Sequence, residues 1–442
     1  MPAPDRRSFV KFASAAAIAT QARPILGAND RVNVAVVGIG GRGSFHLRTY
    51  LGLPTARITG LCDVNQAARE VAQAAVAKAG QDKAAEYEDM RKLFDDKNVD
   101  AVSIATPNHW HALSAIWAVQ AGKDVYVEKP ASHNIFEGHQ MIAAARKHKR
   151  MMQVGSQSRS TPLKMEAMKL LHDGAIGKIY LAKALCFKRR KSIGVTPAEP
   201  VPAGVNWDIF LGPAPMRPFT KNRFKYNWHW FWDTGNGDIG NQGVHEMDIA
   251  RWGLGLPDAR HEGLKTIYCT GGKFAYVDDQ ETPNTQLATF DYGDKQIVFE
   301  VRGILTNGES GMTGKGNVVG NLFLGSDGIL EVDDSGYRVY KGEDRVATIQ
   351  KKRERNSGGD ENTTGLHMTN FLNAVKSRNH KDLTAEIEIG ASSAALCHMA
   401  NIAYRTGRQL KWDVAKEQFI GDNEANKLLT RDYRKPYVVE KV

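Results

Sequence analysis

Residues 32–43, VNVAVVGIGGRG, decide the fold. The valine-rich run predicts a buried strand, and the sequence after the glycines predicts a helix. A G-x-G-x-x-G pattern between a strand and a helix is typical of a dinucleotide-binding turn. Gly38 would permit the tight turn, Gly40 the close approach of a pyrophosphate, and Gly43 the packing of helix on strand. The phosphates would lie at the helix N-terminus, and Arg42 is counted with the cofactor-binding residues.

A second strand, residues 56–62, ends at Asp63, which lies 20 positions after Gly43. A carboxylate there can accept hydrogen bonds from both adenine-ribose hydroxyls and would repel a 2′-phosphate. This spacing predicts NAD as the cofactor and disfavours NADP. The alternative is that Asp63 serves as a helix cap or a turn residue.

Two further strands, 99–105 and 124–127, are separated by a helix predicted over 112–121. Ligands of doubly wound sheets bind at the carboxyl ends of the strands, so we expect the residues that follow both strands to face the same nucleotide. The cofactor-binding residues expected there are Thr106, Asn108, His111, Glu128, Lys129 and Pro130.

These motifs, together with DIGNQGVHEMDIARW at 238–252 and the C-terminal stretch 387–412, resemble the Gfo/Idh/MocA (glucose–fructose oxidoreductase/inositol dehydrogenase) family. The resemblance covers nearly all of the chain after the leader. It implies an α/β fold, with an N-terminal Rossmann doubly wound parallel sheet and a C-terminal α/β domain that has a large open, mainly antiparallel sheet. Residues 285–291 and 296–302 independently predict a hairpin, because each alternates apolar and polar side chains around Tyr292-Gly293-Asp294.

The expected organisation has four parts. They are an export signal and linker (1–30), an NAD(P)-binding Rossmann domain (31–155), a substrate and oligomerisation α/β domain (156–385), and a C-terminal helix and tail that pack back on the core (386–442).

Lys129 is the predicted catalytic base. Oxidation of an alcohol by a nicotinamide needs a group that takes the hydroxyl proton. A partly dry lysine beside a positively charged ring should have a lowered pKa and can act as that base. Its position also matches the family's catalytic lysine. The alternative is a salt bridge to solvent or to Glu128, although neighbours on a strand point to opposite faces.

The resemblance assigns two further catalytic residues. His245 matches the family's active-site histidine, which would contact the reacting hydroxyl; the alternative is a structural histidine. Many family members carry an Asp four residues earlier, where this chain has Asn241. An amide cannot take a proton, so Asn241 could orient the substrate but could not act as a second base.

The segment FKYNWHWFW, residues 224–232, predicts a sugar pocket. Aromatic rings stack on the C–H faces of pyranoses, while polar neighbours bind hydroxyls. A packed aromatic cluster or a dimer interface is the alternative. Family position adds two residues after the Rossmann domain, and the expected substrate-binding residues are Gln157, Arg159, Tyr226, Trp228, His229, Trp230 and His245.

The N-terminal residues predict export. DRRSFVK at 5–11 precedes an apolar run at 12–19 that is shorter than the roughly 20 residues of a membrane span. Paired arginines before such a run resemble a twin-arginine signal, which carries folded proteins and implies a periplasmic location. An amphipathic or disordered tail is the alternative.

Composition excludes several classes of protein. The formal charge is +10, but no nucleic-acid-binding motif surrounds the basic clusters, such as 188–191, which we interpret as solvated surface. The four cysteines lie far apart, which disfavours a zinc site or a disulfide framework. We expect no metal, no nucleic acid and no stable membrane span.

The predicted function is hydride transfer between NAD(P) and a hydroxyl of a sugar, glycoside or polyol. An NAD-dependent glycosidase, working by transient oxidation, elimination and hydration, is the alternative. A non-catalytic nucleotide-binding protein would be expected to lack Lys129 or His245. By analogy with the family, we expect a dimer or a tetramer.

Overall fold

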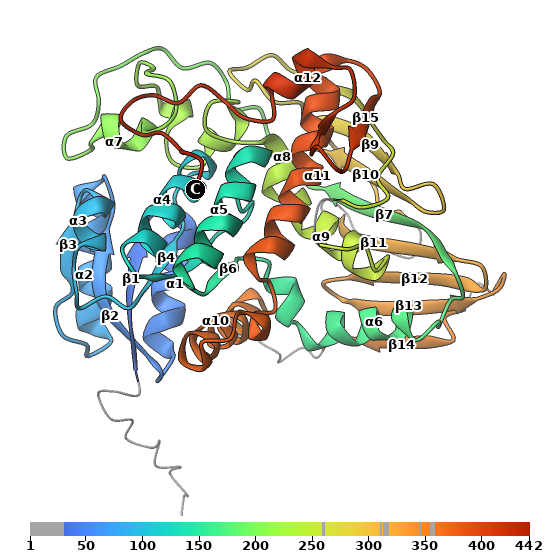
Figure 1. The fold of residues 1–442 in the computed structure, drawn as a ribbon, viewed down its shortest axis with the longest axis horizontal. Coiled ribbons are helices and arrows are strands. Elements are labelled where there is room, and N and C mark those ends of the chain that lie inside the picture. Colours follow the sequence, from blue (N-terminus) through green and yellow to red (C-terminus); the bar gives the residue numbers. More distant parts are fainter. Residues whose placement is uncertain (1–30, 259–260, 310–311, 313–317, 345, 354–358) are drawn as a thin grey trace, which may run out of the picture.

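Figure 1 shows a computed structural model with two halves side by side, a Rossmann half and a half built on a larger sheet. The expected export signal, residues 1–30, lies outside the described residues. The structure describes residues 31–258, 261–309, 312, 318–344, 346–353 and 359–442.

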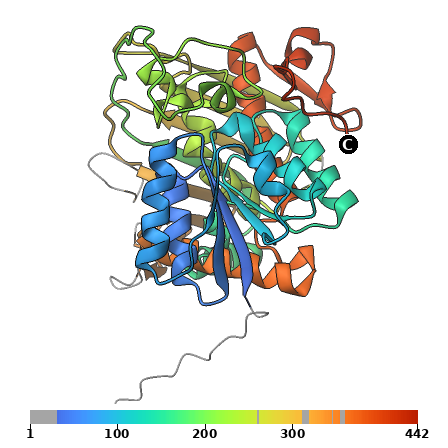
Figure 2. The same ribbon diagram turned by 90° about the vertical axis from the view of Figure 1, so that its left-hand side faces the viewer.

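The Rossmann half is a parallel sheet in the order β3-β2-β1-β4-β5-β6, which is the order of dinucleotide-binding sheets. Figure 2 faces this half and shows helices on both sides of the sheet. Its strands are β1 (Val32–Val37), β2 (Ala56–Cys62), β3 (Ala85–Tyr87), β4 (Ala101–Ile104), β5 (Asp124–Val127) and β6 (Met152–Val154). Its helices are α1 (Gly41–Gly52), α2 (Gln66–Lys78), α3 (Met90–Phe94), α4 (Asn108–Gln120) and α5 (Ile135–His148).

Helix α4 begins at Asn108, four residues earlier than the sequence predicted. Proline is well tolerated at a helix start because its φ is already helical and it has no N–H to satisfy, and Pro107 lies immediately before the helix. The polar residues after β4 therefore belong to the first turn of a helix, not to a loop.

The second half is a mixed sheet in the order β14-β13-β12-β11-β7-β10-β9-β8-β15-β16, and it is mostly antiparallel. The predicted hairpin is confirmed, with Asp291 of β9 opposite Gln296 of β10. The expected fold class is therefore correct. The strands are β7 (Ile179–Phe187), β8 (Thr266–Gly272), β9 (Thr285–Asp291), β10 (Gln296–Arg302), β11 (Val318–Gly325), β12 (Gly328–Asp333), β13 (Gly336–Lys341), β14 (Ile349–Lys352), β15 (Leu410–Asp413) and β16 (Gln418–Phe419).

Helices cover one face of this sheet and join it to the Rossmann half. Helix α11 lies between α5 and β8, and α9 packs on β7. On the uncovered face Tyr268 and Leu287 are both 42% exposed. The remaining helices are α6 (Pro162–His172), α7 (Trp207–Leu211), α8 (Gly237–Asn241), α9 (Gly243–Gly253), α10 (Gly359–Ser377), α11 (Ile387–Thr406) and α12 (Asn423–Lys427).

Helix α10 lies on the Rossmann half, although the expected boundary at 385 assigns it to the second domain. Its apolar residues Met368, Phe371 and Leu372 are fully buried and share a core cluster with Val34 and Ile58. An apolar helix face packs where apolar surface is available to bury, and sequence order does not determine which sheet offers that surface.

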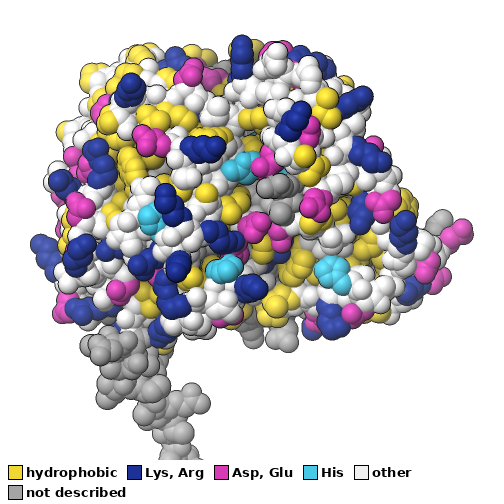
Figure 3. All heavy atoms as spheres, viewed as in Figure 1, with side chains coloured by type: hydrophobic (Ala, Val, Ile, Leu, Met, Phe, Trp, Pro, Cys, Tyr) yellow, Lys and Arg dark blue, Asp and Glu magenta, His cyan; other side chains and the backbone are white. Residues whose placement is uncertain are grey.

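The surface and the cysteines show no special feature. On the face drawn in Figure 3, Lys and Arg side chains are scattered and interleaved with Asp and Glu. All four cysteines are buried and free. Among the described helices, none combines the length and the apolar character that crossing a bilayer requires.

Candidate active site

A cleft of about 1110 Å³ opens where the two halves meet. One wall is formed by the carboxyl ends of the Rossmann strands, including Gly38, Asp63 and Lys129. The other wall comes from the second half and includes Tyr226 and His245. The ends of β1, β4 and β5, which the sequence predicts to lie at one nucleotide, thus face one cavity.

The glycine-rich turn has the geometry that its three glycines were predicted to provide. Gly38 has φ +79°, a conformation that side-chain-bearing residues rarely adopt. A Cβ on Gly43 would lie 1.7 Å from the carbonyl oxygen of Gly38, so helix and turn touch there. A Cβ on Gly40 would meet nothing within 4 Å, and no side chain caps α1. The turn therefore leaves space and free N–H groups for an anionic ligand.

Asp63, which directly follows β2, stabilises the glycine-rich turn through hydrogen bonds. One carboxylate oxygen accepts from the backbone N–H of Ile39 at 2.6 Å, and the other accepts from that of Asn65 at 2.8 Å. Burial raises the pKa of Asp63, and these hydrogen bonds oppose the rise. The residue also lines the cleft, so it stands where a ribose would follow the phosphates.

Among the residues that follow β4, one buried hydroxyl group is suited to bind a dinucleotide. Thr106 lines the cleft, and its hydroxyl is buried without a hydrogen-bond partner in the described part of the chain. Such a group is costly unless a ligand or water satisfies it. Asn108 and His111 also line the cleft but have structural partners, namely Asn236 and the carbonyls of Thr106 and Pro130.

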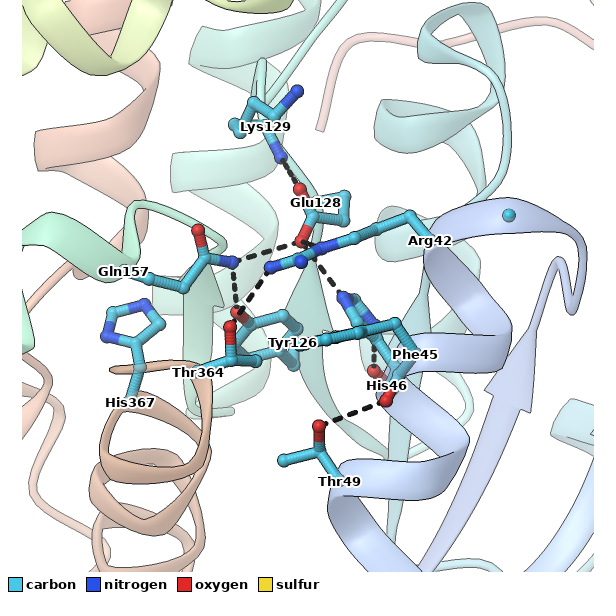
Figure 4. Close-up of polar contacts among 12 residues, drawn as sticks. Arg42, Phe45, His46, Thr49, Tyr126, Glu128, Lys129, Gln157, Thr364 and His367 are labelled. Atoms are coloured by element: carbon cyan, nitrogen blue, oxygen red, sulfur yellow. Dashed lines mark hydrogen bonds and ion pairs between the residues drawn. The ribbon is translucent and has the colours of Figure 1, made fainter. Parts of the chain in front are cut away.

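Glu128 is the centre of a buried polar cluster (Figure 4). Its carboxylate accepts from Arg42 Nε at 2.9 Å and Gln157 Nε2 at 3.1 Å, and it lies 2.9 Å from His46 Nε2. Burial alone would raise its pKa, but Arg42 and His46 hold the pKa of Glu128 well below the ordinary value. Arg42, expected at the cofactor, is thus tied to Glu128 at the cleft wall. Pro130 does not line the cleft.

Lys129 points away from this cluster. Its ammonium donates to Asn241, to the backbone oxygen at 3.0 Å and to the side-chain oxygen at 3.3 Å. Burial lowers the pKa of Lys129, and the positive charges of Arg42 and Lys188 lower it further, although Glu128 opposes them. Lys129 and Glu128 do not pair through their side chains, as the strand geometry predicted.

Asn241 therefore positions Lys129. Its amide nitrogen donates to the Tyr226 hydroxyl at 3.2 Å, which fixes its oxygen toward the ammonium. Arg190 also donates to that hydroxyl and forms a bidentate pair with Asp238. The hydrogen bonds that link Arg190, Tyr226 and Asn241 thus fix the orientation of the Lys129 amine.

His245 projects into the same cleft from the first turn of α9. Its ring makes no hydrogen bond to any described residue, so both nitrogens are available to a ligand. Burial, and next the charge of Lys129, lower the pKa of His245 to about 3. The ring is therefore neutral near pH 7.

Part of the aromatic segment 224–232 lines the cleft, and part of it is buried in the protein. Tyr226, Trp228 and His229 line the cleft, and the rings of Trp228 and His229 stack at 3.5 Å. Trp230 does not line it: the residue is 3% exposed and lies under Arg190. Trp230 therefore lies outside the cleft in which it was expected to bind substrate, because the short 3-10 turn at Asn227–Trp230 directs it inward.

Of the two residues predicted after the Rossmann domain, Gln157 lines the cleft and donates to Tyr126 and Glu128. Arg159 does not line it. Its guanidinium is buried, donates to Asp248 at 2.8 Å and lies over Trp252. Arg159 lies outside the cleft because a buried arginine must be paired with an opposite charge, and Asp248 provides that charge.

Sequence reasoning missed Lys188, Gln242 and Glu246, which line the cleft. We interpreted 188–191 as solvated surface, but side chains alternate along an extended segment. Lys188 and Arg190 accordingly face inward, whereas Lys191 is exposed. Gln242 and Glu246 could have been found from their one-turn spacing on the helix that carries His245.

Two family models match the chain. The model described as "Oxidoreductase family, NAD-binding Rossmann fold" matches residues 32–156, and "Oxidoreductase family, C-terminal alpha/beta domain" matches 174–262 and 339–439. Together they cover most of the chain and both walls of the cleft.

Curated relatives are similar mainly over part of their length. A "Glycosyl hydrolase family 109 protein" of Saccharopolyspora erythraea is 33% identical over 157 residues, which is 34% of this chain and 34% of the relative. "Inositol 2-dehydrogenase 1" of the same organism is 33% identical over 171 residues, which is 38% of this chain and 50% of the relative. The chain thus matches about a third to a half of these relatives.

Among solved structures, a levoglucosan dehydrogenase in complex with NADH and levoglucosan has a TM-score of 0.67 at 18% identity. The match covers 86% of this chain and 99% of that one. At this identity the likeness concerns the fold.

Proposed function

Because the chain belongs to the Gfo/Idh/MocA family of oxidoreductases, we propose that it transfers a hydride between NAD and a hydroxyl-bearing carbon of a sugar, glycoside or polyol. The observation that carries the proposal is the position of Lys129. Its amine lies in one cleft with the glycine-rich turn and with the free imidazole of His245.

A bound nicotinamide supplies the hydride acceptor when an alcohol is oxidised. The chain supplies the proton acceptor: the neutral amine of Lys129 takes the hydroxyl proton while the C–H bond yields its electron pair as hydride. Asn241 holds that amine in place. His245, neutral and unpaired, hydrogen-bonds the same hydroxyl oxygen. Asp63 accepts hydrogen bonds from the ribose hydroxyls, and its negative charge selects NAD over NADP because it repels a 2′-phosphate.

The substrate class follows from the opposite wall. Tyr226, Trp228 and His229 offer ring faces and polar atoms together, as a pyranose requires. The bound levoglucosan of the structural neighbour agrees with a small sugar in this cleft.

The test is NADH formation. The purified protein is mixed with NAD and a panel of sugars, and absorbance is followed; growth of the NADH band with free sugars supports the proposal. If no sugar, glycoside or polyol yields NADH and bound nucleotide is never reduced, the proposal is wrong.

The alternative is an NAD-dependent glycosidase, which the name of the glycosyl hydrolase relative favours. Transient oxidation acidifies the neighbouring C–H, so elimination and hydration follow without net NADH. A nitrophenyl glycoside separates the two functions: nitrophenol release without NADH supports the glycosidase, and NADH from free sugar without nitrophenol supports the dehydrogenase.

We also propose export through the twin-arginine signal at residues 5–11, and a location in the periplasm. An exported enzyme needs a cofactor that is bound before export and regenerated in place. Replacing Arg6 and Arg7 by Lys should trap the protein in the cytoplasm, as measured by cell fractionation. Equal periplasmic amounts of both forms would contradict this.

A dimer or tetramer is the proposed assembly. The uncovered face of the large sheet, with exposed Tyr268 and Leu287, is the surface that a second copy would bury. Light scattering on the purified protein measures the mass, and a monomer at micromolar concentration would contradict the proposal.

A further inference from the structure

The cationic side chains of the cleft differ in whether a carboxylate balances them. Arg42 pairs with Glu128 at 2.9 Å, Lys164 pairs with Asp334 at 2.8 Å, and Lys351 pairs with Glu166. Lys188 differs from these three side chains. Within the described residues it forms no ion pair, and its ammonium donates only to the neutral oxygen Oε1 of Gln242, at 3.0 Å.

Lys188 lies in the same cleft as Lys129. It follows directly on the end of β7 and lines the cleft. The last residue of α8, Asn241, accepts from Lys129, and the next residue, Gln242, accepts from Lys188. Two ammonium groups thus flank one helix junction, and Lys188 is among the charges that lower the pKa of Lys129.

No carboxylate at this junction neutralises Lys188. The Gln242 amide nitrogen donates to Glu246 at 3.3 Å, which turns the amide oxygen toward Lys188. Glu246 is 4% exposed, and its second oxygen has no partner among the described residues. Burial raises the pKa of Glu246 to about 8, which favours its uncharged form. The remaining carboxylate, Asp238, is engaged in the bidentate pair with Arg190.

We propose that the sugar substrate carries an anionic group, a carboxylate or a phosphate, and that Lys188 is its partner. The inference rests on the proposed function and specifies its substrate. A substrate that fills the cleft removes water from an ammonium that has no counter-charge, which is costly unless the substrate supplies one. Lys129 cannot supply the attraction, because it must be uncharged to accept a proton. The exposed ammonium groups of Lys225 and Lys352 at the rim add to the same field.

Sugars that differ only at the sixth carbon test the proposal. Wild-type protein with NAD is assayed on glucose, glucuronate and glucose 6-phosphate, and on the corresponding galactose and mannose sets. In the best set, kcat/KM for an anionic member should exceed that of the neutral sugar by about tenfold or more. The uronate and phosphate arms identify which anion is bound. Preference for the neutral sugar in every active set would overturn the inference.

The variant Lys188→Gln tests the residue. It should reduce the ratio of anionic to neutral kcat/KM by about tenfold, whereas Lys188→Arg should keep it. Lys191→Gln is the matched control, since it removes the same charge three residues away from an exposed side chain outside the cleft. An unchanged ratio in Lys188→Gln would overturn the assignment.

Two measurements keep the outcomes distinct. If Lys188→Gln does not fold, the wild-type KM for the anionic sugar is measured in increasing salt, where it should rise more steeply than that of the neutral sugar; equal slopes would contradict the inference. NADH from neutral sugars alone would contradict the anionic substrate and leave the proposed function standing. No NADH from any sugar would contradict both.

Discussion

At the scale of single residues, the chemistry depends on the environment of one amine, that of Lys129. Lys129 is buried, and Asn241 holds its ammonium through two oxygens. Burial and two neighbouring cations favour the uncharged form. A lysine in this setting can exchange a proton with a substrate hydroxyl, which a solvated lysine near pH 7 would rarely do.

Replacing Lys129 by Met should therefore remove the base and keep the pocket. We expect kcat to fall by about 10²- to 10⁴-fold, while NADH still binds because the glycine-rich turn and Asp63 are untouched. Stopped-flow hydride transfer and fluorescence titration with NADH measure the two effects. Turnover at the wild-type rate would end the assignment of Lys129.

The pH dependence follows from the same residue. The amine must be neutral to accept a proton, so activity is complete above its pKa and is lost as the pH falls through it. Because the pKa of Lys129 lies below its ordinary 10.5, the acid limb of kcat/KM should lie below pH 10.5. Since the pKa of His245 is about 3, the histidine adds no limb near neutral pH. Lys129→Arg, charged throughout, should be inactive across the range; a pH-independent kcat/KM would contradict this account.

Cofactor choice is also a residue property. Asp63→Asn removes the charge that would repel a 2′-phosphate and keeps an oxygen for the turn. The kcat/KM for NADP relative to NAD should rise by about tenfold. Asp82→Asn, which removes an exposed carboxylate of the same half, is the control. An unchanged ratio in Asp63→Asn would show that Asp63 does not face the ribose.

At the scale of elements, the site is built where helices begin. Helix α1 begins at the glycine-rich turn, α4 at Asn108, and α9 at Gly243. Short turns into a helix fix the position of backbone N–H groups and nearby side chains. The predictions for these elements were accurate where the cause is local. Strands β2 and β5 match their predicted bounds, and each ends directly before an acidic residue, Asp63 or Glu128.

The contact between α1 and its turn is testable. A methyl group at Gly43 would meet the carbonyl oxygen of Gly38 at 1.7 Å, so Gly43→Ala should displace the helix, cost about 1–3 kcal/mol and weaken NADH binding. Gly52→Ala is the control, since a Cβ there meets nothing within 4 Å. Calorimetric melting and NADH titration measure both variants. Unchanged NADH binding by Gly43→Ala would contradict the role of this contact.

At the scale of the whole molecule, α11 holds the two halves around the cleft. Its first turns share a core cluster with the Rossmann strands through Ile387 and Ala391, and its later turns share one with the large sheet through Leu396 and Met399. One rigid helix in both cores fixes the distance between the Lys129 wall and the His245 wall.

A substitution at the start of α11 should weaken the connection between the two halves. Glu386 caps the helix and forms a bidentate pair with Arg146 of α5 at 2.7 and 3.0 Å. Glu386→Ala should destabilise the protein by about 1–3 kcal/mol, seen as a lower melting temperature. Glu388→Ala, in the same turn but 38% exposed, should have a smaller effect. Equal melting temperatures for Glu386→Ala and wild type would show that the pair does not link the halves.

The sequence by itself determined the strand tips that meet at the nucleotide, because a strand, a glycine-rich turn and an acidic residue at a fixed distance are local features. It also determined the hairpin formed by residues 285–291 and 296–302. Only the tertiary structure decided which side chains share the cleft. Arg159 and Trp230 face inward, Lys188 faces the cleft, and α10 packs on the Rossmann half. Those outcomes depend on charges and apolar surfaces that residues far apart in the chain bring to the same place.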